Sequence, residues 1–184
     1  MARIEVLSGD AVPAEAKSTY DAATGYGPFA SLAGAMAQRP SILNRVFGLL
    51  DDLREEGVLD RRSLELALVA VSKLNACDYC VAHHSPMLNV VGASAHAIEN
   101  ILDYETVEEF DEKDRLVIAY AKAVTLDANR VRDRVFDQLR GHFSEPQIVE
   151  LTWRIALCGA FNRFNDVLQL DIEADAQTAM ENVA

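Results

Sequence analysis

The sequence predicts an all-α fold, and three features of the chain lead to that prediction. None of the 184 residues lies in a segment with the alternation of apolar and polar side chains that is typical of a β-strand. Residues 144–147, Ser-Glu-Pro-Gln, combine the S-x-x-Q pattern of a capping box with an early proline, which is typical of a helix start. Apolar side chains recur at helical spacing, as at Ile42, Val46, Leu49, Leu50 and Leu53.

The N-terminal part of the chain is expected to be the least regular. Residues 1–30 show little periodicity and contain glycines and prolines, which indicates an irregular arm with one short helix near residues 14–23. Ser41 is expected to cap a helix that continues to Leu53, and Gly57 is expected to end it.

The next two helices should carry the chemistry. Asp60 is a suitable N-cap for a helix that is apolar nearly all round over residues 64–71, so this helix should be buried. Asn75 is expected to cap the helix that follows, and Pro86 should kink it.

The remaining sequence predicts further helices over residues 93–102, 111–126, 131–139 and 144–168. We therefore expect an irregular arm (1–30), a single helical domain (31–170) and a C-terminal tail (171–184). A faint internal repeat aligns residues 64–66 with 149–151, which places Asn162 at the position of Cys77 and Asn165 at that of Cys80. Two similar helical hairpins would explain this repeat, and so would coincidence between two amphipathic helices.

Composition limits the classes of partner. A net charge of −12 argues against nucleic acid and anionic membrane surfaces, so small molecules or other proteins are the expected partners. No apolar run is long enough to span a membrane, and the N-terminus lacks the pattern of a secretory signal, so we expect a cytoplasmic protein. In a reducing cytoplasm, a C-x-x-C pair indicates redox or metal chemistry and not a structural crosslink.

Two cysteines and a histidine are spaced so that they share one face of a helix. At about 100° per residue, Cys80 and His84 lie roughly 300° and 340° from Cys77, within a sector about 60° wide. Glu65 lies twelve residues before Cys77 in an apolar run, where an unpaired carboxylate would cost free energy. These four residues are the candidate catalytic residues.

Together these residue types support thiol redox chemistry. A cysteine reacts with peroxide as the thiolate, which is only a few per cent of the thiol at pH 7 when the pKa is about 8.5. His84 is the candidate base, and Glu65 would orient the imidazole and stabilise its charged form. Peroxide would oxidise one sulfur to a sulfenic acid, which the second thiol converts to a disulfide. A helix N-terminus favours Cys77 as the attacking thiolate, whereas the position of His84 favours Cys80.

The pattern E-x11-C-x2-C-x3-H, formed by Glu65, Cys77, Cys80 and His84, resembles the signature of alkylhydroperoxidase D and the wider carboxymuconolactone decarboxylase family. Residues 40–43 (Pro-Ser-Ile-Leu) and 161–166 (Phe-Asn-Arg-Phe-Asn-Asp) also resemble segments of peroxidase-related members. The resemblance covers about residues 30–170. In alkylhydroperoxidase D a histidine precedes the second cysteine, where this chain has Tyr79, so the resemblance does not extend to a histidine-assisted step there.

The resemblance implies a helical bundle of the alkylhydroperoxidase D-like type and a thiol peroxidase that reduces hydrogen or organic hydroperoxides. It implies that Cys80 meets the peroxide and Cys77 resolves, without metal or other cofactor. It further implies a homo-oligomer and a reducing dithiol or lipoylated protein partner. The irregular arm and the aromatic segment 153–166 independently indicate a homo-oligomer.

Other interpretations of the same residues remain open at this stage. They are a thiol–disulfide reductase or redox sensor, a lactone decarboxylase, which needs no C-x-x-C, and a helical assembly module with vestigial cysteines. A zinc site would use both cysteines, His84 and either Glu65 or His83, but it lacks the second ligand pair of strong zinc motifs.

The neighbouring residues carry simpler expectations. His83 points about 100° away from His84 on a helix and is expected to face solvent or a neighbouring subunit. Tyr79 is expected to pack by its ring, with its hydroxyl near the pocket as a donor. Cys158 is expected to be a core thiol, and Arg163 and Asp166 to form a buried or interfacial ion pair.

Overall fold

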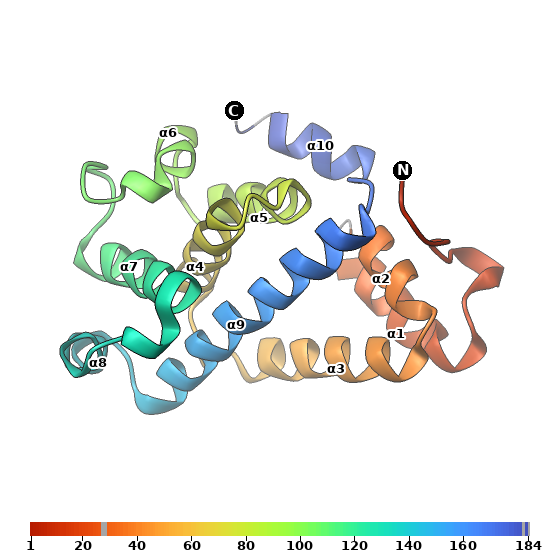
Figure 1. The fold of residues 1–184 in the computed structure, drawn as a ribbon, viewed down its shortest axis with the longest axis horizontal. Helices are drawn as coiled ribbons and strands as arrows, with labels where there is room; N and C mark the ends of the chain where they lie inside the picture. Colours follow the sequence, from red (N-terminus) through yellow and green to blue (C-terminus); the bar gives the residue numbers. More distant parts are fainter. Residues whose placement is uncertain (27–28, 182, 184) are drawn as a thin grey trace.

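The computed structural model describes residues 1–26, 29–181 and 183, and within them it contains helices and no strand (Figure 1). The prediction of an all-α fold is confirmed. The helices, in chain order, are α1 (Ala14–Tyr26), α2 (Ala30–Ala37), α3 (Pro40–Glu56), α4 (Arg61–Leu74), α5 (Asp78–Val90), α6 (Ala95–Glu99), α7 (Glu112–Asp127), α8 (Asp133–His142), α9 (Glu145–Leu168) and α10 (Ala174–Glu181). Short 3₁₀ turns lie at Gly9–Ala11, Ile101–Asp103 and Ala128–Arg130.

Helix α4 lies at the centre of the molecule. It packs against α5, α7 and α9, and its residues 66–71 are all buried, as its nearly continuous apolar sequence predicts (Figure 1). One apolar cluster joins α4 to α7, α8 and α9. A second joins α1, α2 and α3 to the start of α5 and includes Cys77 and Cys80. The cysteines therefore lie in the apolar cluster that the N-terminal helices complete.

Local signals set most of the helix ends. Asp60 caps α4 by accepting a hydrogen bond from the backbone N–H of Ser63, as predicted. Gly57 ends α3 with a φ of 60°, in the left-handed region where glycine has no steric penalty. The capping box that begins α9 is also present.

Two predicted caps are wrong by a few residues. Helix α3 begins at Pro40, because proline is favoured in a first helical turn, so Ser41 lies inside the helix. Asn75 ends α4 instead of starting α5, and Cys77 is the N-cap of α5, with no side-chain capping bond. Ala76 makes the turn between the two helices with a φ of 53°.

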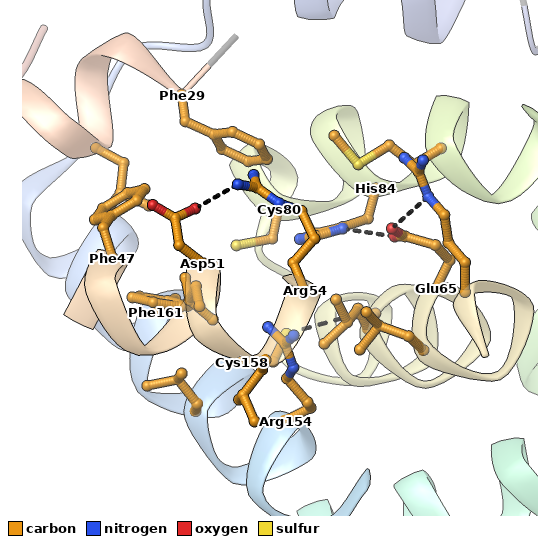
Figure 2. Close-up of a pocket in the computed structure, with 18 of the residues that line it drawn as sticks. Phe29, Phe47, Asp51, Arg54, Glu65, Cys80, His84, Arg154, Cys158 and Phe161 are labelled. Carbon is orange, nitrogen blue, oxygen red and sulfur yellow. Dashed lines mark hydrogen bonds and ion pairs between the residues drawn. The ribbon is translucent and has the colours of Figure 1, made fainter. Parts of the chain in front are cut away.

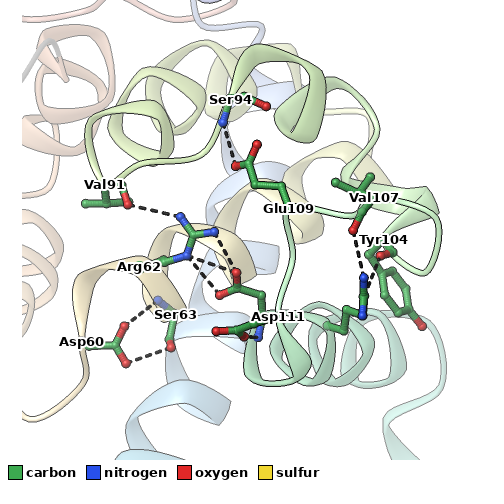
Figure 3. A network of polar contacts seen from close by, with 11 residues as sticks. Asp60, Arg62, Ser63, Val91, Ser94, Tyr104, Val107, Glu109 and Asp111 are labelled. Carbon is green, nitrogen blue, oxygen red and sulfur yellow. Dashed lines mark hydrogen bonds and ion pairs between the residues drawn. The ribbon is translucent and has the colours of Figure 1, made fainter.

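A polar network fastens α4 to α7 and to the turn after α5 (Figure 3). Arg62 forms an ion pair with the buried carboxylate of Asp114 at 2.7 Å and donates to the carbonyl oxygen of Val91. The hydrogen bonds that Arg62 donates to Asp114 raise the pKa of Arg62 against the opposing effect of burial. Separating Arg62 from Asp114 would leave a buried charge without its partner, which is costly in free energy. The network therefore holds the N-terminal half of α4 against α7 and the turn after α5.

The two ends of the chain contain helices that the sequence did not predict, α2 and α10. The backbone N–H of Leu7 donates to the carbonyl oxygen of Gly34 in α2, and a Cβ at Gly34 would lie 2.3 Å from the oxygen of Leu7. Only glycine allows this approach. The backbone N–H of Arg3 donates to Leu168, so the N-terminal segment lies against its own chain. Helix α10 packs on α5.

None of the helices in the described parts of the chain is both long and apolar enough to cross a bilayer.

Candidate active site

A cavity of about 370 Å³ lies among α3, α4, α5 and α9, and the candidate reactive residues reach it from two sides (Figure 2). Most of its wall is apolar. The apolar lining includes Phe29, Leu32, Phe47, Leu50, Leu53, Leu59, Leu64, Leu68, Met87, Leu157 and Phe161. The polar and sulfur-containing residues of the wall are three arginines, the carboxylates Asp51, Glu65 and Glu150, and Tyr79, Cys80, His84, Cys158 and Asn165. This combination of an apolar enclosure with a few convergent polar groups is typical of a binding site for an organic molecule.

Glu65 and His84 form a hydrogen-bonded pair in the wall of the cavity. Nδ1 of His84 lies 2.8 Å from Oε2 of Glu65, which is only 3% exposed. A carboxylate accepts hydrogen bonds, so Nδ1 carries a proton, and in the neutral form of the ring Nε2 carries the lone pair. The second oxygen of Glu65 faces Arg61 at 3.8 Å. The buried carboxylate is therefore paired, and the pair presents a base to the cavity.

The two cysteines differ in their access to the cavity. Cys80 lines it and is 5% exposed, whereas Cys77 is fully buried and is not among the lining residues. The Sγ of Cys77 donates to the carbonyl oxygen of Asn162 at 3.8 Å. The adjacent thiol of Cys80 and burial raise the pKa of Cys77 far above its ordinary value. Cys77 is thus held as a neutral thiol beside Cys80, and both are reduced in this structure.

Two asparagines of α9 contact the cysteines, and sequence reasoning did not name them as candidate site residues. Nδ2 of Asn165 donates to the sulfur of Cys80 at 3.3 Å, and Asn162 lies against Cys77 through its backbone. The faint internal repeat had aligned Asn162 with Cys77 and Asn165 with Cys80, and this was the signal that could have found them. The two segments differ in shape, since α4 and α5 are separated by a turn whereas α9 is unbroken.

Behind the cysteines, His83 lies in a second polar cluster and not at the surface, so its predicted position was wrong. It is 2% exposed and stacks between the rings of Phe29 and Tyr79. Its Nδ1 faces the carbonyl oxygen of Tyr79 at 2.6 Å, and its Nε2 faces Glu173 at 2.9 Å. The reason is that α10, which the sequence did not predict, covers this face of α5.

Tyr79 lines the cavity and packs by its ring, as expected, and its hydroxyl makes hydrogen bonds within the cluster around His83. It donates to Oε1 of Glu173 at 3.0 Å and accepts from the backbone N–H of Leu32 at 3.3 Å. Burial, together with the nearby charge of Glu173, raises the pKa of the Tyr79 hydroxyl. Glu173 thus joins the N-terminal helices, α5 and the C-terminal segment.

The other sequence expectations have mixed outcomes. Cys158 is a buried thiol, as expected, and burial raises its pKa to about 12. Arg163 and Asp166 are both exposed in this chain, and Arg163 donates to the carbonyl oxygen of Gly159, so a buried ion pair is wrong. The alternative of an interfacial ion pair stays a prediction. Within the described residues, no three His, Cys, Asp or Glu side chains converge as metal ligands would, which leaves the zinc interpretation without a ligand set.

Comparison with known proteins agrees with this architecture. The sequence profile of the Carboxymuconolactone decarboxylase family matches residues 40–123. The chain is 21% identical to YdfG of Bacillus subtilis (strain 168) over 117 residues, which are 63% of this chain and 80% of that protein. Its fold is similar to the alkylhydroperoxidase AhpD core of a peroxidase-related protein from Ralstonia eutropha JMP134, with a TM-score of 0.83, 20% identity and coverage of 97% and 96% of the two chains.

The fold is also similar to that of the debrominase Bmp8, in a cysteine-to-alanine variant bound to 2,3,4-tribromopyrrole. The TM-score is 0.79 at 17% identity, and both chains are covered completely. The matched profile begins at the start of α3 and runs through α4 and α5, so it contains Glu65, both cysteines of the C-x-x-C pair and His84. Over residues 40–123 this chain is therefore similar to the carboxymuconolactone decarboxylase family, and it has the alkylhydroperoxidase D-like fold.

Proposed function

We propose that the protein is a thiol peroxidase that reduces organic hydroperoxides, with Cys80 as the attacking residue and Cys77 as the resolving one. The observation that supports this proposal most directly is that Cys80 and the Glu65–His84 pair line the same cavity, while Cys77 lies beside them as a buried thiol. Sequence reasoning left the choice of attacking sulfur open, and access to the cavity now favours Cys80.

The proposed reaction proceeds in two steps. His84 accepts the proton of Cys80, and the thiolate attacks the terminal oxygen of the hydroperoxide, which breaks the O–O bond. The departing alkoxide takes the proton from His84 and leaves as an alcohol, so Cys80 becomes a sulfenic acid. The sulfur of Cys77 then attacks that of Cys80, and the thiol proton leaves with the hydroxyl group as water. An external dithiol reduces the resulting disulfide.

Glu65 has a supporting role in this scheme. Its buried carboxylate holds the His84 ring with Nδ1 protonated and stabilises the imidazolium that forms when Nε2 takes the proton. The size and apolar lining of the cavity favour an organic hydroperoxide over hydrogen peroxide, because a cavity of about 370 Å³ is far larger than hydrogen peroxide needs.

Reductive dehalogenation is a second candidate, favoured by the similarity of fold to the debrominase Bmp8 over the whole chain. In that reaction the two thiols supply two electrons, a carbon–bromine bond becomes a carbon–hydrogen bond, and bromide and a disulfide are the products. It would use the same cavity and the same cysteine pair. Lactone decarboxylation, the reaction in the family's name, would consume no thiol.

The test is an anaerobic thiol count on the reduced protein before and after one equivalent of cumene hydroperoxide or 2,3,4-tribromopyrrole. The proposal expects the hydroperoxide to remove two thiols per chain and to leave Cys158 free, because its buried thiol has a pKa of about 12. Cys77→Ser should still consume one equivalent and accumulate a sulfenic acid on Cys80, whereas Cys80→Ser should not react. Cys158→Ser is the matched control and should behave as the wild type.

Release of bromide without consumption of hydroperoxide would favour dehalogenation instead. A sulfenic acid trapped on Cys77 in the Cys80→Ser variant would reverse the two roles but retain the redox function. If neither compound removes thiols, the redox proposal fails as a whole.

We also propose that the protein forms a homo-oligomer through α9. Three of its large apolar side chains, Val149, Trp153 and Val167, are exposed and lie within about 40° of one another around the helix. Sedimentation at micromolar concentration should show an assembly, and Trp153→Glu should dissociate it. A wild-type monomer would contradict this proposal.

A further inference from the structure

Arg154 is the one cavity-lining arginine that is buried. It lies on α9, is 9% exposed, and directs its guanidinium from α9 toward the interior of the cavity (Figure 2). The other two lining arginines lie closer to solvent, where Arg54 pairs with Asp51 at 3.0 Å and Arg61 faces Glu65 at 3.8 Å. A buried cation in an apolar wall is costly, so its contacts decide what it can bind.

The contacts of Arg154 leave most of its hydrogen-bonding capacity unused. Within the described residues, its one hydrogen bond runs from Nε to Oε1 of Glu150, one turn earlier on the same helix, at 3.3 Å. That is longer than the roughly 2.8 Å of a strong charge-assisted hydrogen bond. No acceptor among the described residues meets the terminal nitrogens Nη1 and Nη2. Glu150 therefore holds the guanidinium through Nε, and the two terminal nitrogens Nη1 and Nη2 remain available to a molecule in the cavity.

A structural role alone explains this arrangement poorly. Apolar side chains of similar volume usually stabilise a protein as well as a buried ion pair does, and the surrounding wall of the cavity is apolar. The forked end of a guanidinium matches the two oxygens of a carboxylate in spacing and direction, and two parallel N–H···O bonds can form there.

We propose that the cavity binds hydroperoxides that carry a carboxylate, and that Arg154 binds this carboxylate. The substrate class is then an organic acid hydroperoxide whose apolar body contacts the leucine and phenylalanine side chains of the wall. Its O–O bond lies at Cys80, and its acid group lies at Arg154. This inference rests on the proposed peroxidase function for the reaction itself, while binding of the acid group depends on the cavity alone.

The kinetic test compares 4-(2-hydroperoxypropan-2-yl)benzoic acid with its methyl ester, which has the same reactive group and no charge. With excess dithiol as reductant, the wild type should prefer the acid in kcat/KM by about tenfold or more, because a bidentate charged contact is lost in the ester. Arg154→Gln should lower kcat/KM for the acid by about tenfold through KM and leave the ester within about twofold. Arg163→Gln, on the exposed face of the same helix, is the matched control and should change neither.

A binding measurement separates this inference from the proposed function. The alcohol 4-(2-hydroxypropan-2-yl)benzoate, the expected product, should bind the reduced wild-type protein in calorimetry and bind Arg154→Gln about tenfold more weakly. Binding of this kind without turnover of either hydroperoxide would support the acid site while the peroxidase proposal fails.

Equal kcat/KM of the wild type for acid and ester would overturn the inference, and so would an equal loss for both compounds in Arg154→Gln. Should Arg154→Gln fail to fold, as thermal unfolding would reveal, Arg154→Lys provides the same comparison. Lysine keeps the charge but cannot donate two parallel hydrogen bonds, so Arg154→Lys should retain only part of the preference for the acid. Full retention by Arg154→Lys would overturn the bidentate contact.

Discussion

The side-chain amide of Asn165 donates a hydrogen bond to the sulfur of Cys80 at 3.3 Å, from a helix 85 residues further along the chain. The other end of this amide, Oδ1, is buried and has no hydrogen-bond partner in the described residues. An N–H donor directed at sulfur favours the thiolate over the thiol. Asn165 is thus a positioning residue for the reacting sulfur in the proposed reaction.

Asn165→Ala should therefore shift the pH midpoint of the reaction with cumene hydroperoxide upward by about one to two units, because a hydrogen bond to a charged group contributes about 1.5–3 kcal/mol. Asn165→Asp should shift it further, since a carboxylate beside the sulfur opposes a second negative charge. Asn162→Ala changes the neighbouring amide, whose contact with Cys77 is through the backbone, and serves as the control. An unchanged pH profile in Asn165→Ala would show that Asn165 contributes only to packing and does not assist the reacting sulfur.

The second prediction concerns Glu65, which within the described residues pairs with His84 at 2.8 Å and faces Arg61 at 3.8 Å. Glu65→Gln keeps the volume and removes the charge, so it should slow the reaction with hydroperoxide by about 10²-fold or more. If the carboxylate acts through the imidazole, adding Glu65→Gln to His84→Ala should cost little more than His84→Ala alone. Fully additive losses in stopped-flow rate constants would show that the two residues act separately.

The sequence was sufficient for features that depend on short spacings. The C-x-x-C pair, His84 one turn later and the apolar run around Glu65 all lie within 20 residues, and helix geometry relates such positions directly. The buried Glu65–His84 contact follows from that pattern, because a carboxylate in an apolar run must find a partner.

What could not be predicted depends on contacts between distant segments. The inference that His83 points away from His84 was sound, but whether that direction is solvent or core depended on the C-terminal segment, in which Glu173 lies directly before α10 and 90 residues from His83. Helix α2 is short and rich in alanine and glycine, so it has little amphipathic pattern to recognise, and its burial comes from the packing of α1 and α3. The role proposed for Arg154 likewise could not be predicted from the sequence, because it depends on the cavity that this residue lines.

The third prediction concerns Glu173, which attaches α10 to α5. Burial alone would raise its pKa, but hydrogen bonds from His83 and from the backbone N–H of Ser31 outweigh burial, so its pKa is lowered below the ordinary value of 4.5. A lowered pKa in the folded state contributes stability that is present above pH 4.5 and is lost as the pH falls through the folded-state value. The protection of residues 174–181 against hydrogen exchange, measured relative to the intrinsic exchange rate at each pH, should therefore fall below that pH.

Glu173→Gln should show the reduced protection already at pH 6, with little further change in protection on acidification, because the titrating group is gone. Asp175→Asn, at an exposed position of the same helix, should keep the pH response of the wild type. The same loss of protection at low pH in both variants would assign the pH response to other carboxylates.

The fourth prediction concerns Ala76, directly before Cys77. Its φ of 53° lies in the left-handed region, which costs a residue with a Cβ about 1–2 kcal/mol. Ala76→Gly removes that cost, while the greater conformational freedom of glycine in the unfolded chain lowers the free energy of unfolding by about 0.4–1 kcal/mol. The variant should therefore be more stable by about 0.5–1 kcal/mol in urea unfolding of the reduced protein.

Gly57 provides the reverse substitution at a matching position, since it has a φ of 60° at the end of α3 and a Cβ there would meet no atom within 4 Å. Gly57→Ala should lower the free energy of unfolding by a similar amount, and for the same backbone reason. If Ala76→Gly proved less stable than the wild type while Gly57→Ala behaved as expected, the methyl group of Ala76 would have to contribute packing that exceeds the backbone strain. In that case the turn before Cys77 would be held by side-chain contacts, and the strain at φ 53° would not be what sets its stability.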